Sequence, residues 1–583
     1  MNLINFKTSI YKMTMVLAFF LIPALGKPQI LVKAKKIQSP FSKTSVETVT
    51  YKRDYLERLN IENISDLLNT IPGFHHTASG SFVETRFRGF KESRHVQILI
   101  DGVSLNDPTA PGGQALFSQV PIDHIESIVV EKGHNSVSEG PNAVAAVIKI
   151  KTLKNKNIFQ IGSGSYGSSK ISLGLNKPSF GLQASFQKSN NISSMKGNNE
   201  DLDDTAKKNG ALRFSSNIKR WKLEANVRHD EVKERYDQIF QPEKDYKSFS
   251  QTQIMSIRAE KELFLDLMDL TLWADKVYFK RSYPEGWPGY KLFKGSNASF
   301  KARAKLYINK NHNGLLGFGT KKSNYTNKQL SLSMNHAFYQ HKWTLKDTAI
   351  DIGGRYESSP KFIGHLSPFL KLTKTLEDNW YITMKGSRTY TPPSLNQIYA
   401  QKTPLSSEKI DQFTFGLEKN APNSLYGADL FYTRYRETIV WEEETRLYKM
   451  EKDQRDLFGT EWFFQKKINP FLRLKGFLNI TRGINSKRET HDIQGISRSH
   501  LGITTDLNTQ KWFWMNNIKA FGKYKTSTKT QDFSLVDTSI GHRLNQKTTL
   551  LLKVNNLFNE GYILKEGYQT KGRHYFLKAS MLF

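Results

Sequence analysis

Four carboxylate side chains gather in one polar stretch of this 583-residue chain, NNEDLDDTAKKN. Ca²⁺ prefers several carboxylate oxygens as ligands, so a cluster of this kind predicts a calcium site. The spacing is not that of an EF-hand, and an ordinary acidic surface loop has the same composition. Both interpretations therefore stay open for Glu200, Asp201, Asp203 and Asp204.

Two adjacent histidines, His75 and His76, form a second group that could do chemistry, because imidazole is a common metal and haem ligand. Neighbouring residues of an extended segment point to opposite sides, so the pair is poorly placed to hold one ion. They lie in the polar, glycine-containing stretch HHTASGSFVE, which indicates a surface loop. We therefore expect solvated loop histidines here.

No catalytic constellation is visible in the sequence. The motifs HExxH, GxSxG and the P-loop are missing, and the chain has no cysteine. Disulfides, thiolate metal sites and cysteine nucleophiles are thereby excluded. The sequence predicts a protein that is not an enzyme and requires no cofactor, with calcium in an outer loop as the one ion to consider.

Two arginines, Arg86 and Arg88, alternate with Phe87 in RFRGF, which predicts a strand that points both guanidinium groups to one side. An unpaired charge inside a protein is very costly, so such a pair needs carboxylate partners. We expect structural ion pairs at these residues rather than contacts with a ligand.

The arginines open a compact α/β module. Short apolar runs at Val96 to Ile100 and Ser127 to Glu131 end at turn residues, as strands do, and the stretch between them allows one or two helical turns. Upstream, Lys52 to Leu59 is predicted to be helical. A second short helix is predicted after the cap residues Asn63 to Asp66, with Pro72-Gly73 as its stop.

These pieces, RFRGF, ILIDGVSLND and IESIVVEKG, with LLNTIPGF before and GPNAVAAVIKIKT after them, resemble the plug domain of TonB-dependent outer-membrane transporters. The resemblance covers about Val46 to Thr152. It implies a plug at residues 39–152 inside a barrel at 153–583, so that Arg86 and Arg88 pair with the barrel. It also implies a ligand floor made by two outward loops, with Ser79, Gly80, Ser81 and Phe82 in the first and Asn106, Asp107, Thr109 and Gln114 in the second.

From about Asn155 the chain changes to short runs that alternate apolar and polar residues, as in KISLGL, where Ile171, Leu173 and Leu175 share one face. Mean hydropathy is −0.53, which suits barrel strands because their two faces average out. Dividing the residues after Lys156 over about 22 strands leaves room for strands and connections. The predicted fold is an all-β membrane protein, an antiparallel barrel of about 22 strands with an N-terminal α/β plug. The final alternation from Tyr575 to Phe583 resembles the ending of such barrels.

The N-terminus predicts export. Lys7 and Lys12 precede an apolar run that ends in Ala24-Leu25-Gly26, so residues 1–26 are predicted to be a signal peptide. Residues 27–38 then hold a short apolar strand between charges, which suits pairing with the edge of a partner's sheet. By the family resemblance this is the TonB box, formed by Gln29, Ile30, Leu31, Val32, Lys33 and Ala34.

The chain has 85 Lys and Arg against 54 Asp and Glu, a net charge of +31. The basic residues are spread along the sequence, which favours anionic lipid headgroups and an anionic solute over nucleic acid. As the resemblance implies, we expect a monomeric importer in the outer membrane of a Gram-negative bacterium, coupled to TonB. Its cargo would be a scarce metal chelate, either a ferric siderophore or cobalamin. A passive channel or adhesin built on the same barrel is the alternative hypothesis, and a secreted all-β enzyme is a third hypothesis.

Overall fold

The computed structural model describes residues 48–79, 82–90, 93–115, 122–133, 136–195, 202–238, 241–264, 267–285, 291–442, 444–452, 455–485 and 487–583. The predicted signal peptide and TonB box lie outside these residues. Within the described ranges, no helix has the length and apolar character needed to cross a membrane.

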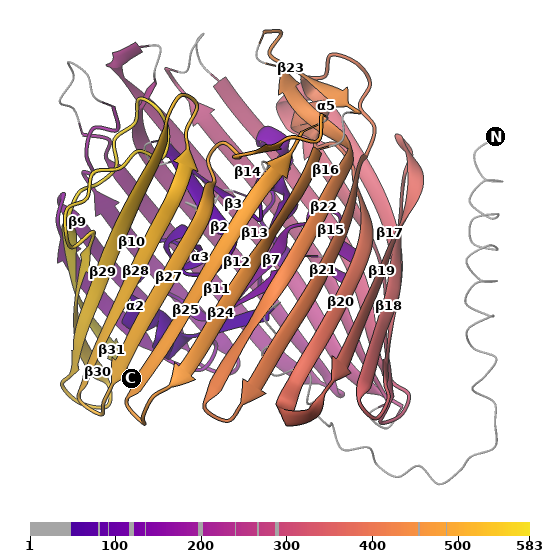
Figure 1. The fold of residues 1–583 in the computed structure, drawn as a ribbon, viewed down its shortest axis with the longest axis horizontal. Coiled ribbons are helices and arrows are strands. Elements are labelled where there is room, and N and C mark those ends of the chain that lie inside the picture. The colour runs from indigo at the N-terminus through magenta and orange to yellow at the C-terminus, as the bar shows by residue number, and fades with distance from the viewer. Residues whose placement is uncertain are drawn as a thin grey trace. The chain divides into compact units, whose positions relative to one another are not determined.

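Antiparallel strands close into one barrel (Figure 1). The ring contains 24 strands, of which β23 and β26 are short and are bypassed, because β22 also pairs with β24 and β25 with β27. Twenty-two strands thus form the wall, as the sequence predicts. The ring closes where β31 pairs with β8. The strands are β8 (Ile158–Gly164), β9 (Ser168–Asn176), β10 (Phe180–Ser189), β11 (Thr205–Ile218), β12 (Trp221–Gln238), β13 (Gln241–Leu263), β14 (Met268–Tyr283), β15 (Lys291–Tyr307), β16 (His312–Tyr325), β17 (Leu330–Thr344), β18 (Thr348–Ser359), β19 (Phe362–Thr375), β20 (Trp380–Thr391), β21 (Glu408–Ala421), β22 (Ser424–Glu442), β23 (Leu447–Glu451), β24 (Arg455–Lys467), β25 (Leu472–Ile484), β26 (Thr490–His491), β27 (Ser497–Asn508), β28 (Trp512–Lys525), β29 (Thr530–Arg543), β30 (Thr548–Asn555) and β31 (His574–Leu582).

The two ends of the barrel differ in their connections. At the end where the chain finishes, turns of two to four residues join the strands. The longest connections, residues 190–204, 392–407 and 556–573, all lie at the other end. Outer-membrane barrels have short periplasmic turns and longer outer loops, so the end with the long loops faces outward.

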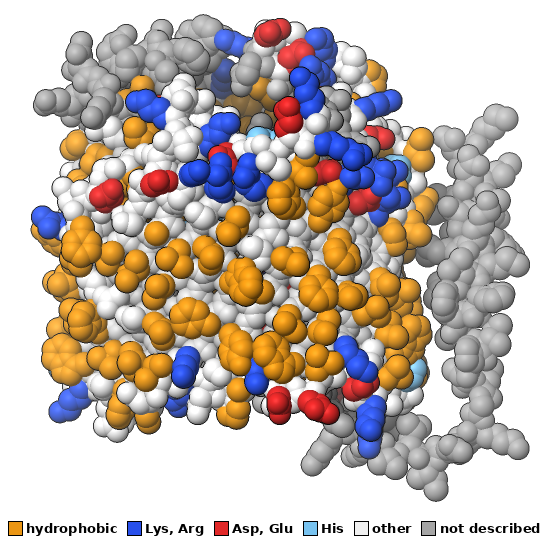
Figure 2. All heavy atoms as spheres, viewed as in Figure 1, with side chains coloured by type: hydrophobic (Ala, Val, Ile, Leu, Met, Phe, Trp, Pro, Cys, Tyr) orange, Lys and Arg blue, Asp and Glu red, His pale blue; other side chains and the backbone are white. Residues whose placement is uncertain are grey.

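The wall alternates apolar side chains outside with polar ones inside. On β22, Leu430 is 55% exposed while its neighbours Asp429 and Phe431 are buried. On β24, Trp462 is 56% exposed next to Glu461, which is fully buried. Figure 2 shows the result as a band of hydrophobic side chains with charged residues above and below it. This is the pattern of a wall that faces lipid outside and a polar lumen inside.

The plug is built on a five-stranded sheet in the order β1-β6-β7-β4-β5. Its strands are β1 (Thr48–Lys52), β4 (Val96–Ile100), β5 (Val103–Ser104), β6 (Ile125–Lys132) and β7 (Ala146–Thr152). The two strands predicted within the module are present as β4 and β6. They are not neighbours, because β7 lies between them and pairs in parallel with β4. In the chain between β4 and β6, the described residues contain one short 3₁₀-helical turn, η4 (Pro111–Gly113).

The plug has two short helices where the sequence predicts them. Helix α2 (Arg53–Leu59) ends at Asn60 in the left-handed conformation. Helix α3 (Ile64–Leu68) starts at a capping box, in which the Asn63 side chain accepts from the amide of Asp66 and the Asp66 carboxylate accepts from Asn63. A further single turn, α4 (Ser136–Glu139), precedes β7. The apolar faces of α2 and α3 join the main buried core of the molecule.

Two local predictions were wrong. The stretch that begins at His75 is not a loop, because β2 (Phe74–Ser79) and β3 (Phe82–Phe87) form a hairpin there. Strand β3 ends at Phe87, so Arg88 lies beyond it with a positive φ of 46° and does not share a strand face with Arg86.

Candidate functional site

The plug is fixed to the wall by a buried charge cluster around Arg88. Its guanidinium donates from Nε and Nη2 to the two carboxylate oxygens of Glu461, both at 2.8 Å, and from Nη2 to Asp429 at 3.3 Å. Lys132 of β6 donates to the same Glu461 at 2.8 Å. All four side chains are nearly inaccessible to water. Gly73 permits the approach, since a Cβ at this position would lie 2.4 Å from the Glu461 carboxylate.

Arg86 plays a different part. Its Nη1 donates to the backbone carbonyl of Gln494 in an outer loop at 2.6 Å, and its Nη2 lies 3.3 Å from Glu84 in the same hairpin. The two arginines of the motif, separated by Phe87 alone, therefore contact separate parts of the barrel.

Two more arginines anchor the plug. Arg94 forms an ion pair with Glu408 of β21, and the Nε2 atom of His95 lies 3.0 Å from the same carboxylate. Arg58 of α2 donates to both oxygens of Asp506 at 3.0 and 2.9 Å. Bidentate arginine–carboxylate pairs are both strong and geometrically specific, so these contacts fix the plug's orientation.

The second predicted ligand loop is also tied to the wall. Asp107 is fully buried, accepts from Arg281 of β14 at 3.1 Å and accepts from Thr109 at 2.8 Å. Gln114 and Thr109 are buried as well. Of the four residues, Asn106 alone lines a described cavity. Its backbone carbonyl accepts a hydrogen bond from the side-chain amide of Asn297 of β15 at 2.9 Å. In the first loop, Gly80 and Ser81 lie outside the described residues, and Ser79 and Phe82 close the β2–β3 hairpin.

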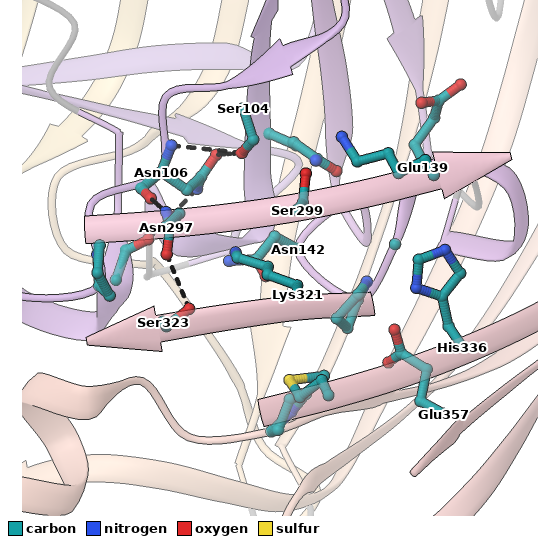
Figure 3. Close-up of a pocket in the computed structure, with 18 of the residues that line it drawn as sticks. Ser104, Asn106, Glu139, Asn142, Asn297, Ser299, Lys321, Ser323, His336 and Glu357 are labelled. Atoms are coloured by element: carbon teal, nitrogen blue, oxygen red, sulfur yellow. Dashed lines mark hydrogen bonds between the residues drawn. The ribbon is translucent and has the colours of Figure 1, made fainter. Parts of the chain in front are cut away.

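A cavity of about 180 Å³ lies between the plug and strands β14 to β18 (Figure 3). Figure 3 shows Asn106, Asn297 and Ser323 at one end, where they are joined by hydrogen bonds, and His336 and Glu357 toward the other. The described residues that line it include five cations and three carboxylates, so the cavity carries an excess of two positive charges. These residues are Arg94, Lys301, Arg303, Lys321, Arg355, Glu139, Asp275 and Glu357.

Part of the plug side of this cavity is formed by the segment from Val137 to Asn142, which we name the arch and of which Ser138 to Asn142 line the cavity. Two wall arginines hold it through its backbone. Arg303 of β15 donates to the Ser138 carbonyl at 2.9 Å, and Arg355 of β18 donates to the Val137 carbonyl at 3.3 Å. The Val137 side chain packs against Phe338 and Phe369 of the wall.

Glu139 of the arch is ionised throughout the physiological range. Burial by itself would raise the pKa of this carboxyl, but the positive charges of Lys149 and Arg303 lower the pKa to about 2. Lys149 of β7 lies 3.0 Å from it and Arg303 lies 3.5 Å from it. The carboxylate thus has one partner in the plug and one in the wall.

A second, larger cavity of about 310 Å³ lies on another side of the plug, between α3 and β2 and the wall strands β9 to β11 and β28 to β30. Its described lining has five lysines and five carboxylates, so it shows no preference for either sign of charge. The residues are Lys188, Lys207, Lys519, Lys553, Lys571, Glu62, Asp66, Asp203, Glu234 and Asp537. We therefore regard the smaller, basic cavity as the candidate site for an anion.

The predicted calcium residues are only partly within the described chain. Asp203 accepts from the amide of Ser194 at 2.7 Å, and Asp204 pairs with Arg235 at 2.8 Å. Glu200 and Asp201 lie outside the described residues. In the part that is described, no three His, Asp or Glu side chains gather as metal ligands would.

His75 is buried rather than solvated, with 1% of its surface exposed, and its ring lies 5.3 Å from that of His500 on β27. Burial lowers the pKa of His75 to about 4 and that of His76 to about 3. Both imidazoles are therefore neutral at pH 7.

Sequence reasoning missed the arch and the wall residues that line the basic cavity. The inward positions of β15 and β18 carry Arg303 and Arg355, and inward polar positions are a signal that alternation can supply. Which of these cations meet the plug depends on the docking of the two parts, and no local pattern encodes that.

Comparison with known proteins follows the same division of the chain. Residues 40–147 match the TonB-dependent receptor plug domain, and residues 155–557 match the TonB-dependent receptor-like β-barrel. A vitamin B12 transporter BtuB of Vibrio vulnificus (strain CMCP6) is 28% identical over 143 residues, which cover 23% of this chain and 23% of that protein. The match thus spans under a quarter of the length of that curated relative.

Solved structures share the fold over nearly the whole chain. The copper transporter OprC superposes with a TM-score of 0.78 at 15% identity, covering 93% of this chain and 98% of that one. The siderophore receptor PirA from Acinetobacter baumannii gives 0.77 at 14% identity, covering 95% and 100%. At these identities the likeness shows the fold alone. Because the barrel match covers most of the chain and the plug match precedes it, this chain belongs to the TonB-dependent receptor family of outer-membrane β-barrel proteins.

Proposed function

We propose that this protein imports a scarce anionic metal chelate across the outer membrane, with energy supplied by TonB. Ligand would enter from the end with the long loops and bind between the plug and the wall. TonB would then pair with the segment Gln29 to Ala34 and pull on the plug. The reaction is transport, so catalytic residues are not needed.

The observation that carries the proposal is a plug sealed inside the barrel by buried ion pairs, with a basic cavity at its border. The pairs that involve Arg88, Arg58 and Arg94 would keep a passive pore closed. A closed pore with an internal ligand cavity suits an active importer and disfavours a passive channel or adhesin. It gives no support to a secreted enzyme.

Ligand chemistry follows from the charge of the cavity. An excess of two positive charges in a cavity between plug and wall favours anions, and ferric siderophores fit this better than less charged solutes. A cobalamin carries a phosphodiester and stays as a second candidate, which the partial likeness to BtuB supports. Among the predicted loop residues, Asn106 is the one we retain as a direct ligand contact. Asp107, Thr109 and Gln114 would shape the loop, and Ser79, Gly80, Ser81 and Phe82 remain proposed as the outer floor.

Deletion of Pro28 to Lys36 tests the coupling. The deleted protein is expected to keep its affinity for the chelate and to lose uptake, because the binding cavity is far along the chain from the coupling strand. Whole cells expressing either protein would be compared for surface binding and for accumulation of radiolabelled ferric tricatecholate and cyanocobalamin. Equal accumulation by the two proteins would exclude TonB coupling through this segment.

Lys321→Gln tests the cavity as the binding site. Removing one cation should weaken binding of ferric tricatecholate by about 1–2 kcal/mol, which is roughly five- to thirtyfold in Kd. Cyanocobalamin, which is less charged, should be affected less. Isothermal titration of the purified receptor gives both values, and Lys374→Gln, an exposed lysine at the periplasmic rim, is the matched control. If the Lys321→Gln protein and the parent bind ferric tricatecholate with equal affinity, the binding site lies elsewhere.

Calcium in the loop around Glu200, Asp201, Asp203 and Asp204 is kept as part of the proposal. The same titrations with and without Ca²⁺ test it. We also propose that the protein works as a monomer, with anionic lipid around its charged rims.

A further inference from the structure

The arch is held by two cations that also line the basic cavity. Arg303 and Arg355 donate to the carbonyls of Ser138 and Val137, and both guanidinium groups face the same cavity as Lys321. The cations that would attract an anionic cargo are therefore the ones that fasten this part of the plug.

Each of these arginines has one charged and one neutral acceptor. Arg303 lies 3.5 Å from Glu139 and Arg355 donates to Glu357 at 2.8 Å, while the arch carbonyls are the neutral acceptors and the weaker ones. A backbone carbonyl is a neutral acceptor, whereas a hydrogen bond from arginine to an oxyanion is charge-assisted and about twice as strong. The planar guanidinium also matches carboxylate and phosphate oxygens in pairs. An oxyanion that enters the cavity is thus a better partner for Arg303 and Arg355 than the carbonyls of the arch.

Glu139 does not block this exchange. Its carboxylate lies 3.5 Å from Arg303 but 3.0 Å from Lys149, which belongs to the plug itself. If cargo takes Arg303, Glu139 keeps a partner on its own side of the boundary and is not left as an unpaired charge.

The arch is the lightly held part of the plug. Its fastenings to the wall are the two arginine–carbonyl bonds, the 3.5 Å contact of Glu139 with Arg303, a bond from Thr391 to the Pro141 carbonyl at 3.0 Å, and the contact of Val137 with two phenylalanines. Arg88 and Arg58, by contrast, hold the rest of the plug through buried bidentate pairs with carboxylates of the wall. A cargo that competes for the arginines would loosen the arch and leave the remaining anchors in place.

We propose that Arg303 and Arg355 form an oxyanion subsite shared between the arch and the cargo, and that cargo passes along strands β14 to β18 as the arch gives way. The subsite rests on the proposed import function. It specifies the cargo chemistry as an oxyanion, such as a carboxylate, catecholate or phosphate group.

The subsite is tested first on the purified protein, without transport. Inorganic pyrophosphate serves as the oxyanion probe, and amide hydrogen exchange of the arch is followed by mass spectrometry. Exchange in the arch should become faster with pyrophosphate but not with chloride at equal ionic strength, while exchange in α3 stays the same. Arg355→Gln should raise exchange of the arch about tenfold without any anion, since it removes one fastening bond. If the rate of amide hydrogen exchange in the arch does not change with pyrophosphate, the proposed subsite is wrong.

The path is tested by tethering, for which a chain without cysteine is well suited. The pair Val137→Cys with Phe338→Cys joins the arch to β17. A control pair, Phe90→Cys with Tyr435→Cys, links the plug to β22 where these ring centroids lie 5.5 Å apart, and a reducible crosslinker with two thiol-reactive ends bridges the cysteines of either pair. Mass spectrometry establishes formation of the crosslink, and accumulation of radio-iron-labelled ferric tricatecholate is measured before and after reduction.

The arch tether is expected to lower uptake about tenfold or more, with recovery on reduction, while the control tether leaves uptake unchanged. Loss of uptake with both tethers would mean that the whole plug moves, and unchanged uptake with the arch tether would place the path elsewhere. Either result overturns the proposed path. A parent protein without uptake whose arch still responds to pyrophosphate would retain the subsite and contradict the import function instead.

Discussion

Replacing Glu461 with alanine will open the barrel to ions. The change removes the common partner of the buried cations Arg88 and Lys132, and it leaves Asp429 as a carboxylate partner of Arg88. Removal of one partner from a buried group of paired charges lowers the stability of the fold by about 3–5 kcal/mol. We expect the plug to unfold or shift within an intact barrel, with steady ion conductance in planar bilayers where the parent protein conducts little.

Two further variants separate this effect from general damage. Glu377→Ala removes a carboxylate from an exposed periplasmic turn and should leave conductance unchanged. A fourfold variant, Arg88→Met, Lys132→Met, Glu461→Leu and Asp429→Asn, removes every charge of the cluster and should recover most of the lost stability, since buried ion groups can be replaced by apolar ones of similar size. If the Glu461→Ala protein conducts no more ions than the parent, the plug is held by other contacts.

Acidification from pH 7 to pH 4.5 will loosen the plug. Burial lowers the pKa of His75 and of His124 to about 4, from an ordinary value of 6.5. Between these values the unfolded plug binds protons that the folded plug does not, so stability falls as pH falls. Each histidine loses about 3 kcal/mol of stabilisation on the way from pH 6.5 to pH 4.

Other charged groups do not reverse this trend. Arg86 opposes a proton on His75 and Glu461 favours one, while Asp123 favours one on His124. Carboxyl groups whose pKa the fold lowers change the stability of the plug only at lower pH. Glu139, with a pKa of about 2, keeps its full contribution above about pH 4.5 and loses it as the pH falls toward 2.

The onset of conductance in urea gives the measurement, because it reports plug unfolding while the barrel persists. The urea midpoint should be lower at pH 4.5 than at pH 7. In the triple variant His75→Gln, His76→Gln and His124→Gln the two midpoints should lie closer together than in the parent, because burial lowers the pKa of His76 as well. An equal pH dependence in parent and variant would assign the acid sensitivity to other groups.

The sequence by itself determined the elements of this protein. Alternation such as that of Ile171, Leu173 and Leu175 predicts lipid-facing strands, because a strand's side chains point to opposite faces at every step. The caps at Asn63 and Asp66 predict the start of α3, since an orphan amide needs a nearby acceptor. The missing cysteines and catalytic motifs likewise restrict the chemistry without any structure.

Only the tertiary structure decided what these elements meet. The pattern around Arg88 predicts a carboxylate partner, but the docking of plug and barrel selects Glu461, 373 residues away. The same docking buries Asp107 against Arg281, although its loop has the composition of an exposed one. It also brings the arch to Arg303 and Arg355 and so creates the basic cavity. Burial and pairing at this boundary depend on two surfaces that are distant in sequence, and local composition carries no record of which surface will face which.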